Sequence, residues 1–347
     1  MEVQVLQLED TFHDPLVAPG TPDLPERFFD RFMFNLHPTD ATAPSVIMGA
    51  GVYPVRDVTD GFAVVTTATE QRNLRFSTEL SALSPAAAGS VGPLSWTVLE
   101  PNRSWRLRLA DNPIGLGCDI TWRARTEAWH GGVEVRNADG VPSTFDHLFQ
   151  SGTYTGTITI DGVRTDVAGW YGQRDRSRGV RTMAGGQGLH LWYQAQFPEY
   201  CVGFLHVEDR TGGRLLLEGA VLHTSGEVDD IVDVRHDLTF GPGLDLETGR
   251  VRVTTASGAV LDIDGDARAG GGWMAGAGYG GHHGKPCGVD HLEYDVYPLD
   301  GSVSPATVDS ALTDRLTAFT CDGVAGTGIL EFAHSRSRSY TYRPSLV

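Results

Sequence analysis

Apolar and polar residues alternate with a period of two along much of this chain. Within residues 153–160, Tyr154, Ile158 and Ile160 alternate with threonines, and Asp161-Gly162 follows. Successive side chains of a β-strand point to opposite faces, so this alternation predicts a half-buried strand. The Asp-Gly pair that follows predicts a hairpin turn to the next strand.

The same pattern recurs in the second half of the chain. Residues 251–263 alternate around a Ser-Gly turn, and residues 291–297 alternate again. Residues 204–207 and 215–217 flank a short segment that contains two glycines, as the two strands of a hairpin do. Clear helical periodicity is scarce, so we expect an all-β protein of antiparallel strands.

Three segments depart from this pattern. Residues 304–319 fit a helix capped by Ser304, and a pair of strands fits them almost as well. Residues 84–92 are rich in Ala, Gly, Ser and Pro and predict a surface loop. Residues 267–288 are rich in glycine and carry aromatic and histidine side chains. Because loops of this length in compact proteins often have a function, the last segment is a candidate ligand contact.

The glycine-rich segment contains two patterns that suggest other functions. Residues 276–281 match the spacing of a dinucleotide-binding loop, but residues 282–286 do not open the helix that such a loop requires. Potential metal ligands also lie close together, namely His282, His283, Cys287 and His291. Adjacent histidines do not easily face one ion, so ordinary polar contacts are favoured. We expect neither a metal nor another cofactor.

Composition narrows the possible partners and compartments. The 347 residues carry a net charge of −17 at pH 7, so we expect no nucleic acid partner. This length is typical of two domains. The N-terminus lacks the features of a signal peptide, and no apolar run approaches the roughly 20 residues of a membrane span. We therefore expect a cytoplasmic protein, and the sequence does not indicate its oligomeric state.

One stretch carries a recognisable motif. Residues 169–181 read Gly-Trp-Tyr-Gly-Gln-Arg-Asp-Arg-Ser-Arg-Gly-Val-Arg, shortly after the threonine-rich strand. This stretch resembles the lipocalin-like superfamily of hydroxyneurosporene synthase, also called carotenoid 1,2-hydratase, and most closely its actinobacterial relatives. The residues that match are Arg174, Asp175, Ser177, Gly179 and Arg181. Arg176 and Arg178 depart from the motif, since His and Trp are usual at those positions.

The resemblance implies both a fold and a site. Weaker similarities at residues 27–35 and 326–331 extend it over most of the chain. The family implies two consecutive lipocalin-like antiparallel β-barrel or sandwich domains with a ligand cavity, which we place at residues 1–165 and 166–347. In the carotenoid hydratase the aspartate of this motif is taken as the proton donor, which implies that role for Asp175.

The residues of the motif point to a site without reference to the family. In an extended segment Gln173, Asp175 and Ser177 point to one face, and the intervening arginines point to the other. If the first face lines an apolar cavity, loss of solvation raises the pKa of Asp175, and its neutral carboxyl can protonate a double bond. An ion pair with an arginine would instead lower that pKa and make Asp175 a structural residue. The sequence leaves both possibilities open.

Other residues are candidates for supporting roles. Asp146 and His147 begin a strand and are candidates for catalysis beside Asp175. Aromatic faces stabilise positive charge, and polar groups hold water or substrate. The candidates for substrate binding are Trp170, Tyr171, Gln150, Ser177, Trp192, Tyr279 and Glu331. For several of them, ordinary packing or backbone hydrogen bonding is the simpler explanation.

Two hypotheses of different classes follow. The first is a cofactor-independent lyase, a hydratase or dehydratase that acts on an isoprenoid or other apolar alkene with Asp175 as the acid. The same acid suits isomerisation or cyclisation, whereas a catalyst that works by shaping its substrate needs no acid. The second hypothesis is a carrier that binds a lipid, terpenoid or steroid without chemistry, because a lipocalin-like fold does not determine function.

Overall fold

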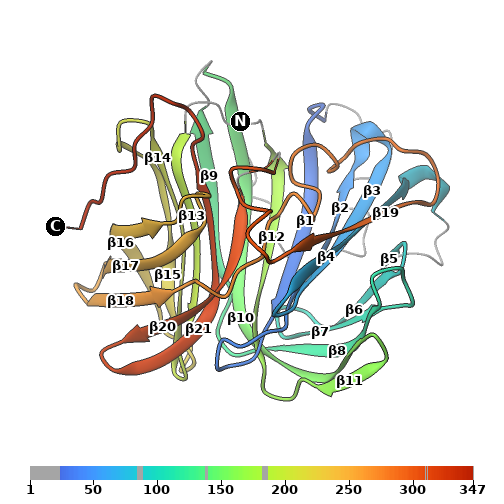
Figure 1. Cartoon of the computed structure of the whole chain (residues 1–347), viewed down its shortest axis with the longest axis horizontal. Coiled ribbons are helices and arrows are strands. Elements are labelled where there is room, and N and C mark those ends of the chain that lie inside the picture. The colour runs from blue at the N-terminus through green and yellow to red at the C-terminus, as the bar shows by residue number, and fades with distance from the viewer. Residues whose placement is uncertain are drawn as a thin grey trace.

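The computed structural model describes residues 24–83, 89–136, 140–181, 187–308, 310 and 312–346. Antiparallel strands dominate these residues, and their helical elements are two single turns, η1 (Pro54–Arg56) and η2 (Leu80–Ala82). The prediction of an all-β protein is therefore confirmed. The strands form a thirteen-stranded sheet and a closed barrel, which stand side by side in Figure 1.

The large sheet contains strands from the first half of the chain and one from the second half. They are β1 (Phe28–Leu36), β2 (Ser45–Tyr53), β3 (Val58–Thr66), β4 (Glu70–Glu79), β5 (Ser90–Val91), β6 (Leu94–Glu100), β7 (Ser104–Leu109), β8 (Leu116–Ala124), β9 (Trp129–Arg136), β10 (Pro142–Ile160), β11 (Val163–Asp166), β12 (Tyr171–Val180) and β19 (His291–Pro298). The barrel strands are β13 (Gln187–Gln196), β14 (Tyr200–Asp209), β15 (Arg214–His223), β16 (Val228–Phe240), β17 (Leu246–Thr255), β18 (Val260–Asp266), β20 (Thr313–Cys321) and β21 (Val324–His334).

The barrel closes because β13 pairs with β14 on one side and with β21 on the other. A barrel of eight strands encloses a space that side chains can fill. Alternation along each strand supplies these side chains: Val234, His236 and Leu238 of β16 are buried, and the residues between them are exposed. Phe204 and Phe332 lie in the same cluster of buried side chains. The interior of the barrel is therefore a packed core.

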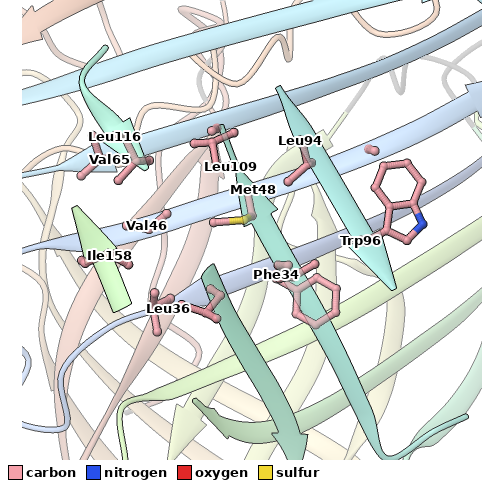
Figure 2. Close-up of a cluster of buried hydrophobic side chains, with 14 of the residues drawn as sticks. Phe34, Leu36, Val46, Met48, Val65, Leu94, Trp96, Leu109, Leu116 and Ile158 are labelled. Atoms are coloured by element: carbon pink, nitrogen blue, oxygen red, sulfur yellow. The ribbon is translucent and has the colours of Figure 1, made fainter. Parts of the chain in front are cut away.

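The large sheet curls around a core of its own (Figure 1). Figure 2 shows that strands far apart in this sheet contribute to one cluster, with Phe34 and Met48 from β1 and β2 and Leu94 and Leu109 from β6 and β7. Trp105 lies in the same cluster and is inaccessible to solvent. Burial of this apolar surface is the dominant favourable contribution to folding of such a unit.

The second half of the chain returns to the large sheet. The glycine-rich segment, residues 267–288, packs on the outer face of β1, β2 and β3. Gln71 holds it there, because its side chain donates to the carbonyl of Trp273 at 2.8 Å and accepts from the amide of Trp273 at 2.9 Å. A Cβ atom at Gly276 would lie 2.0 Å from the side-chain oxygen of Asn73, so this approach requires glycine. β19 then pairs with β4 at the end of the sheet.

Strand pairing bears on the expected division of the chain. β12 pairs with β1 and β10 in the large sheet, although residues 171–180 fall in the second of the two expected domains. β19 joins the same sheet from much further along the chain. The division at residue 165 stays a prediction, because strand pairing defines sheets and does not by itself define units that fold independently.

The two segments expected to be irregular or helical have different outcomes. The described residues of 304–319 form turns followed by β20 and no helix. β20 pairs with β18 and β21, and these tertiary contacts outweigh the local helical signal. The loop expected at residues 84–92 lies largely outside the described residues, which resume just before β5. In the described part of the chain, no helix has the length and apolarity needed to cross a membrane.

The barrel and the large sheet meet in a tightly packed aromatic contact. The ring of Phe149 on β10 lies against Gly203 on β14, where an added Cβ atom would be 2.3 Å from a ring carbon. Trp129 and Trp192 flank the same ring, with centroid distances of 5.1 and 5.3 Å. Close packing around Phe149 therefore fixes the position of the barrel on the sheet.

Candidate functional site

A cavity of about 490 Å³ lies between the large sheet and the barrel. Strands β1, β9, β10 and β12 form one wall, and β13, β14, β15 and β21 form the other. Tyr279 from the glycine-rich segment also lines it, and Val133, Leu205 and Val207 contribute apolar surface. This volume and mixed lining suit an organic molecule of moderate size.

The register of β1, β12 and β10 places a row of polar side chains on the wall that the large sheet contributes to the cavity. Arg31 on β1 is paired with Ser177 on β12, and Ser177 is paired with His147 on β10. Asp175 lies in the next row of β12. Because residues two apart on a strand share a face, Asp175 and His147 are diagonal neighbours on the face that lines the cavity.

Asp175 lines the cavity and is half-buried. No residue in the described part of the chain forms a hydrogen bond or an ion pair with its carboxyl group. Burial is the main cause that raises its pKa from the ordinary 3.8 to about 6. The charge of His147 opposes this rise and the charge of Glu331 adds to it. A neutral carboxyl group is therefore available to a molecule in the cavity near pH 6.

The arginines beside Asp175 make their contacts away from the cavity. Arg174 donates through Nε to the side-chain oxygen of Gln150 at 3.0 Å. Arg176 forms a two-point ion pair with Asp30, with donor–acceptor distances of 2.8 and 2.6 Å. These guanidinium groups are engaged with other partners, so they do not neutralise Asp175. The arginine-rich motif is thus compatible with a free acid.

His147 forms a buried pair with Glu218 on barrel strand β15. Its Nδ1 lies 2.7 Å from a carboxylate oxygen of Glu218, and its ring packs against Trp192 with a centroid distance of 4.7 Å. When Nδ1 donates to the carboxylate, Nε2 is the nitrogen that can accept a proton, and Glu218 stabilises the imidazolium that forms. His147 can therefore act as a base toward a molecule in the cavity.

A second group of acids and histidine lies on the barrel side. Glu331 on β21 is 2.8 Å from His190 Nε2, and Asp314 is directly opposite Glu331 in the β20–β21 pair. Burial, aided by the charge of Glu331, raises the pKa of Asp314 well above its ordinary value. Although burial opposes it, the interaction with His190 lowers the pKa of Glu331. Burial therefore favours the protonated form of Asp314, and the contact with His190 favours the ionised form of Glu331.

The structure places six of the predicted site residues on the cavity wall, namely Asp175, His147, Ser177, Trp192, Tyr279 and Glu331. Asp146 lies on the opposite face of β10. Burial raises its pKa above the ordinary value, and the charge of Arg178 only partly opposes this rise. Gln150 is fully buried and donates to the backbone oxygens of Asn102 and Thr126. Neither of these two side chains lines the cavity.

Trp170 and Tyr171 also lie away from the cavity. Trp170 packs against the core of the large sheet. Tyr171 stands at the start of β12 with the guanidinium of Arg125 over its ring at 4.2 Å. Both residues are close to Asp175 in sequence, but the intervening part of β12 separates them from it in space. The geometry therefore gives no support to a catalytic role for Asp146 or to a substrate-binding role for Gln150, Trp170 or Tyr171.

Sequence reasoning missed several polar residues at this site. Arg31, Arg181 and His190 line the cavity, and Glu218 pairs with His147. Glu218 carries a signal, because it interrupts an otherwise apolar run at residues 215–222, where an unpaired charge is costly. Assigning these residues to one cavity requires the pairing of distant strands, which local patterns do not contain.

One group of described residues has the donor atoms of a metal site. His206, Glu208 and His236 lie inside the barrel, and their potential ligand atoms are within 4.8 Å of one another. Hydrogen bonds already join them, since Glu208 Oε1 is 2.9 Å from His236 Nε2 and 3.2 Å from His206 Nε2. These side chains belong to the barrel core and not to the cavity wall.

The histidines of the glycine-rich segment and His291 on β19 contact carboxyl groups of the large sheet. His282 and His291 lie 3.4 and 2.7 Å from Glu293, and His283 lies 3.4 Å from Asp60. These are the ordinary polar contacts that the sequence favours. His282, His283, Cys287 and His291 do not line the cavity between the sheet and the barrel.

Comparisons with known proteins place the chain in a family and a fold. It belongs to a family of unknown function (DUF8625), whose model matches residues 12–340. A search of curated proteins gives no match. The family match and the solved structures described below do not support the expected likeness to actinobacterial relatives of the carotenoid hydratase.

Solved structures are similar over most of the chain. A Nitrosomonas europaea protein provisionally assigned as AttH has a TM-score of 0.60 and 12% identity, and the match covers 94% of this chain and 100% of that one. CghA with Sch210972 has a TM-score of 0.51 and 10% identity, with 89% of each chain covered. Kievitone hydratase from Nectria haematococca has a TM-score of 0.47 and 13% identity, covering 92% of this chain and 94% of the hydratase. At these identities the first two matches show the fold alone, and the expected lipocalin-like class is confirmed.

Proposed function

We propose that this protein is a cofactor-independent lyase that adds water to a carbon–carbon double bond, or removes it, in a small molecule with a largely apolar body. The observation that carries this proposal is Asp175, a carboxyl with a raised pKa and no described partner, in a cavity between two β units. The motif that resembles the carotenoid hydratases supports the same role for this carboxyl. An isoprenoid or similar alkene fits the apolar part of the wall.

In the direction of hydration, the reaction begins with proton transfer from Asp175 to one alkene carbon. Positive charge then develops on the neighbouring carbon, where the aromatic ring of Trp192 on the wall stabilises it. Water attacks that carbon and loses a proton to His147, whose imidazolium is stabilised by Glu218. The alkene and water become an alcohol, and solvent returns the proton from His147 to Asp175. Dehydration follows the same steps in reverse.

The apolar wall also favours a simpler function, that of a carrier. Val133, Leu205 and Val207 can hold an apolar ligand without any proton transfer. The two functions differ in what Asp175 contributes. A carrier keeps its ligand and shows no turnover whether residue 175 is Asp or Asn, whereas a lyase loses turnover and keeps most of its affinity.

The test is incubation of the protein with a panel of terpenes and prenylated aromatic alkenes in water enriched in heavy oxygen. Mass spectrometry of the products shows whether solvent oxygen is incorporated. We expect one heavy oxygen per product molecule with the native protein and none with Asp175→Asn. Incorporation that persists in Asp175→Asn contradicts the role of the acid. Isomerised or cyclised products without heavy oxygen would mean that the same acid forms the carbocation. The cation would then lose a proton or close a ring instead of adding water.

A further inference from the structure

The cavity carries positive charge in a protein that is strongly acidic as a whole. The net charge of the chain is −17, yet three arginines line the cavity, namely Arg31, Arg181 and Arg336. Arg31 comes from the first strand of the large sheet, and Arg181 follows directly after β12. Placing two cations side by side in a half-enclosed space is unfavourable unless something compensates them.

Aromatic rings, and not carboxylates, hold the two guanidinium groups. Arg31 lies 4.8 Å from the ring centroid of Tyr279 and 5.8 Å from that of Phe29. Arg181 lies 4.5 Å from the ring of Phe145 and 5.3 Å from that of Phe29. The ring of Phe29 is therefore shared by both cations, which brings them close together. Contact with an aromatic face leaves the N–H donors at the edge of a guanidinium free to bind oxygen.

Gly179 makes this arrangement possible. Phe29 and Phe145 are both paired with Gly179 across β12, and their rings meet over it with centroids 6.1 Å apart. A Cβ atom at this position would lie 2.6 Å from the Cα atom of Phe145, and the φ of Gly179 is +148°, so a side chain is excluded. The bare backbone leaves room for Arg181 to reach the paired rings.

Arg31 is half-buried and Arg181 is exposed at the edge of the cavity, and neither has the carboxylate partner that several buried arginines have. Within the described ranges, no hydrogen bond or ion pair joins Arg31 or Arg181 to any residue. By contrast, three buried arginines pair with carboxylates, namely Arg176 with Asp30, Arg75 with Asp295 and Arg315 with Asp245. These three guanidinium groups have a carboxylate in direct contact, whereas the cavity carboxyl groups Asp175 and Glu331 form no ion pair with Arg31 or Arg181.

We infer that the missing counter-ion belongs to the substrate: the cavity takes an amphipathic molecule whose anionic oxygen group, such as a carboxylate or an ionised enol, binds between Arg31 and Arg181. This inference rests on the proposed function and names the substrate class for the same site. Val133, Leu205 and Val207 would contact the apolar body. Planar guanidinium groups suit such oxygen anions because they can donate two parallel hydrogen bonds.

Binding of the anion also serves the proposed acid. The charges of Arg31 and Arg181 both lower the pKa of Asp175 and oppose the effect of burial. An anion between the two arginines offsets their charge. Asp175 then holds its proton more firmly in the complex than in the free protein. The charge of the substrate and the pKa of Asp175 are therefore coupled through Arg31 and Arg181.

A pair of fluorescent probes tests the inference without any turnover. 8-Anilinonaphthalene-1-sulfonate and N-phenyl-1-naphthylamine share one aromatic body, and only the first carries an anionic oxygen group. We expect the native protein to bind the sulfonate more tightly. Arg31→Met and Arg181→Met should each weaken sulfonate binding by about 10–100-fold, the range for a hydrogen bond to a charged group. Binding of the neutral probe should change less than about threefold, which also shows that each variant keeps its cavity.

The control is Arg210→Met, because Arg210 is exposed on the β14–β15 hairpin, away from the cavity; this variant should bind both probes as the native protein does. Equal affinity of the native protein for the two probes would overturn the inference. Unchanged sulfonate binding in both cavity variants would do so as well. Asp175→Asn separates the inference from the proposed function, since it should keep the preference for the sulfonate. A protein that prefers the anion and shows no turnover with any alkene supports the inference and refutes the lyase.

Discussion

The barrel interior and the junction cavity both bury a carboxyl group near histidine, and they affect it in opposite ways. In the barrel, burial raises the pKa of Glu208, but hydrogen bonds from His206 and His236 outweigh burial and lower it to about 2. In the cavity, Asp175 lacks such partners, and burial raises its pKa to about 6. A carboxylate whose partners are built into the core contributes to stability. A carboxyl without them reduces stability and stays available for chemistry.

The largest expected effect separates the two carboxyl groups by activity. Asp175→Asn removes the proton donor, so turnover of the alkene identified in heavy-oxygen water should fall by about 10²–10⁴-fold. Glu208→Gln leaves the cavity intact and should retain activity within a few-fold of the native rate. Steady-state kinetics of both variants measure this contrast. Equal losses in the two variants would mean that the barrel and the cavity do not differ in function.

The second prediction concerns the stability that Glu208 provides. Glu208→Gln removes the charge that accepts from two buried histidines and should lower the free energy of unfolding by about 2–4 kcal/mol at pH 7. The pKa of Glu208 is lowered in the folded state, from 4.5 to about 2. Its contribution is therefore present above pH 4.5 and is lost as the pH falls toward 2.

Urea denaturation at a series of pH values measures this effect. Glu227→Gln is the matched control, because Glu227 is exposed between β15 and β16 and its replacement should change stability little. A Glu208→Gln protein as stable as the native one at pH 7 would show that the hydrogen-bonded carboxylate does not stabilise the barrel.

The third prediction is the same measurement on Asp175, with the opposite sign. Its folded pKa of about 6 exceeds the ordinary 3.8, so the native state holds the proton more tightly than the unfolded chain. Stability is then highest below pH 3.8 and declines as the pH rises toward 6. Asp175→Asn removes this cost and should stabilise the protein by about 1–3 kcal/mol at pH 7 and by much less at pH 4. A loss of stability at pH 7 would contradict the absence of a partner for this carboxyl.

The smallest expected effect tests the contact that joins the two regions. Gly203→Ala places a Cβ atom 2.3 Å from a ring carbon of Phe149 unless the ring shifts. Overpacking of this kind costs about 1–3 kcal/mol, which should lower the melting temperature. Gly132→Ala is the control on neighbouring strand β9, because an added Cβ atom there meets nothing within 4 Å. Equal melting temperatures for the two variants would show that Phe149 does not fix the junction.

Period-two alternation predicts the local parts of this structure. It predicts the strands around residues 153–160, and along β12 it assigns Asp175 and Ser177 to one face and the arginines to the other. The same rule argues against choosing both Asp146 and His147 for one cavity, since adjacent residues of a strand face opposite sides. Gln150 has the parity of Asp146 and also faces away from the cavity. Nearness to Asp175 along the chain predicts which side chains line the cavity less well than this alternation does.

The rest of the site depends on contacts between distant strands. Arg31 reaches Ser177 through the pairing of β1 with β12, and Glu218 reaches His147 from the barrel. No local period encodes such pairings, so a lone charge in an apolar strand shows that a partner is needed without naming it. Residues 313–319 illustrate the same limit, because pairing with β21 determines their strand conformation.

Direct titration of the Asp175 carboxyl tests the central claim most sharply. Native protein and Asp175→Asn, both labelled at the aspartate carboxyl carbon, are followed by NMR between pH 3 and pH 8, and the resonance absent from the variant belongs to Asp175. Burial without a counter-ion predicts a midpoint of about 6. A midpoint at or below 3.8 would mean that an arginine neutralises this carboxyl and that it cannot serve as the acid.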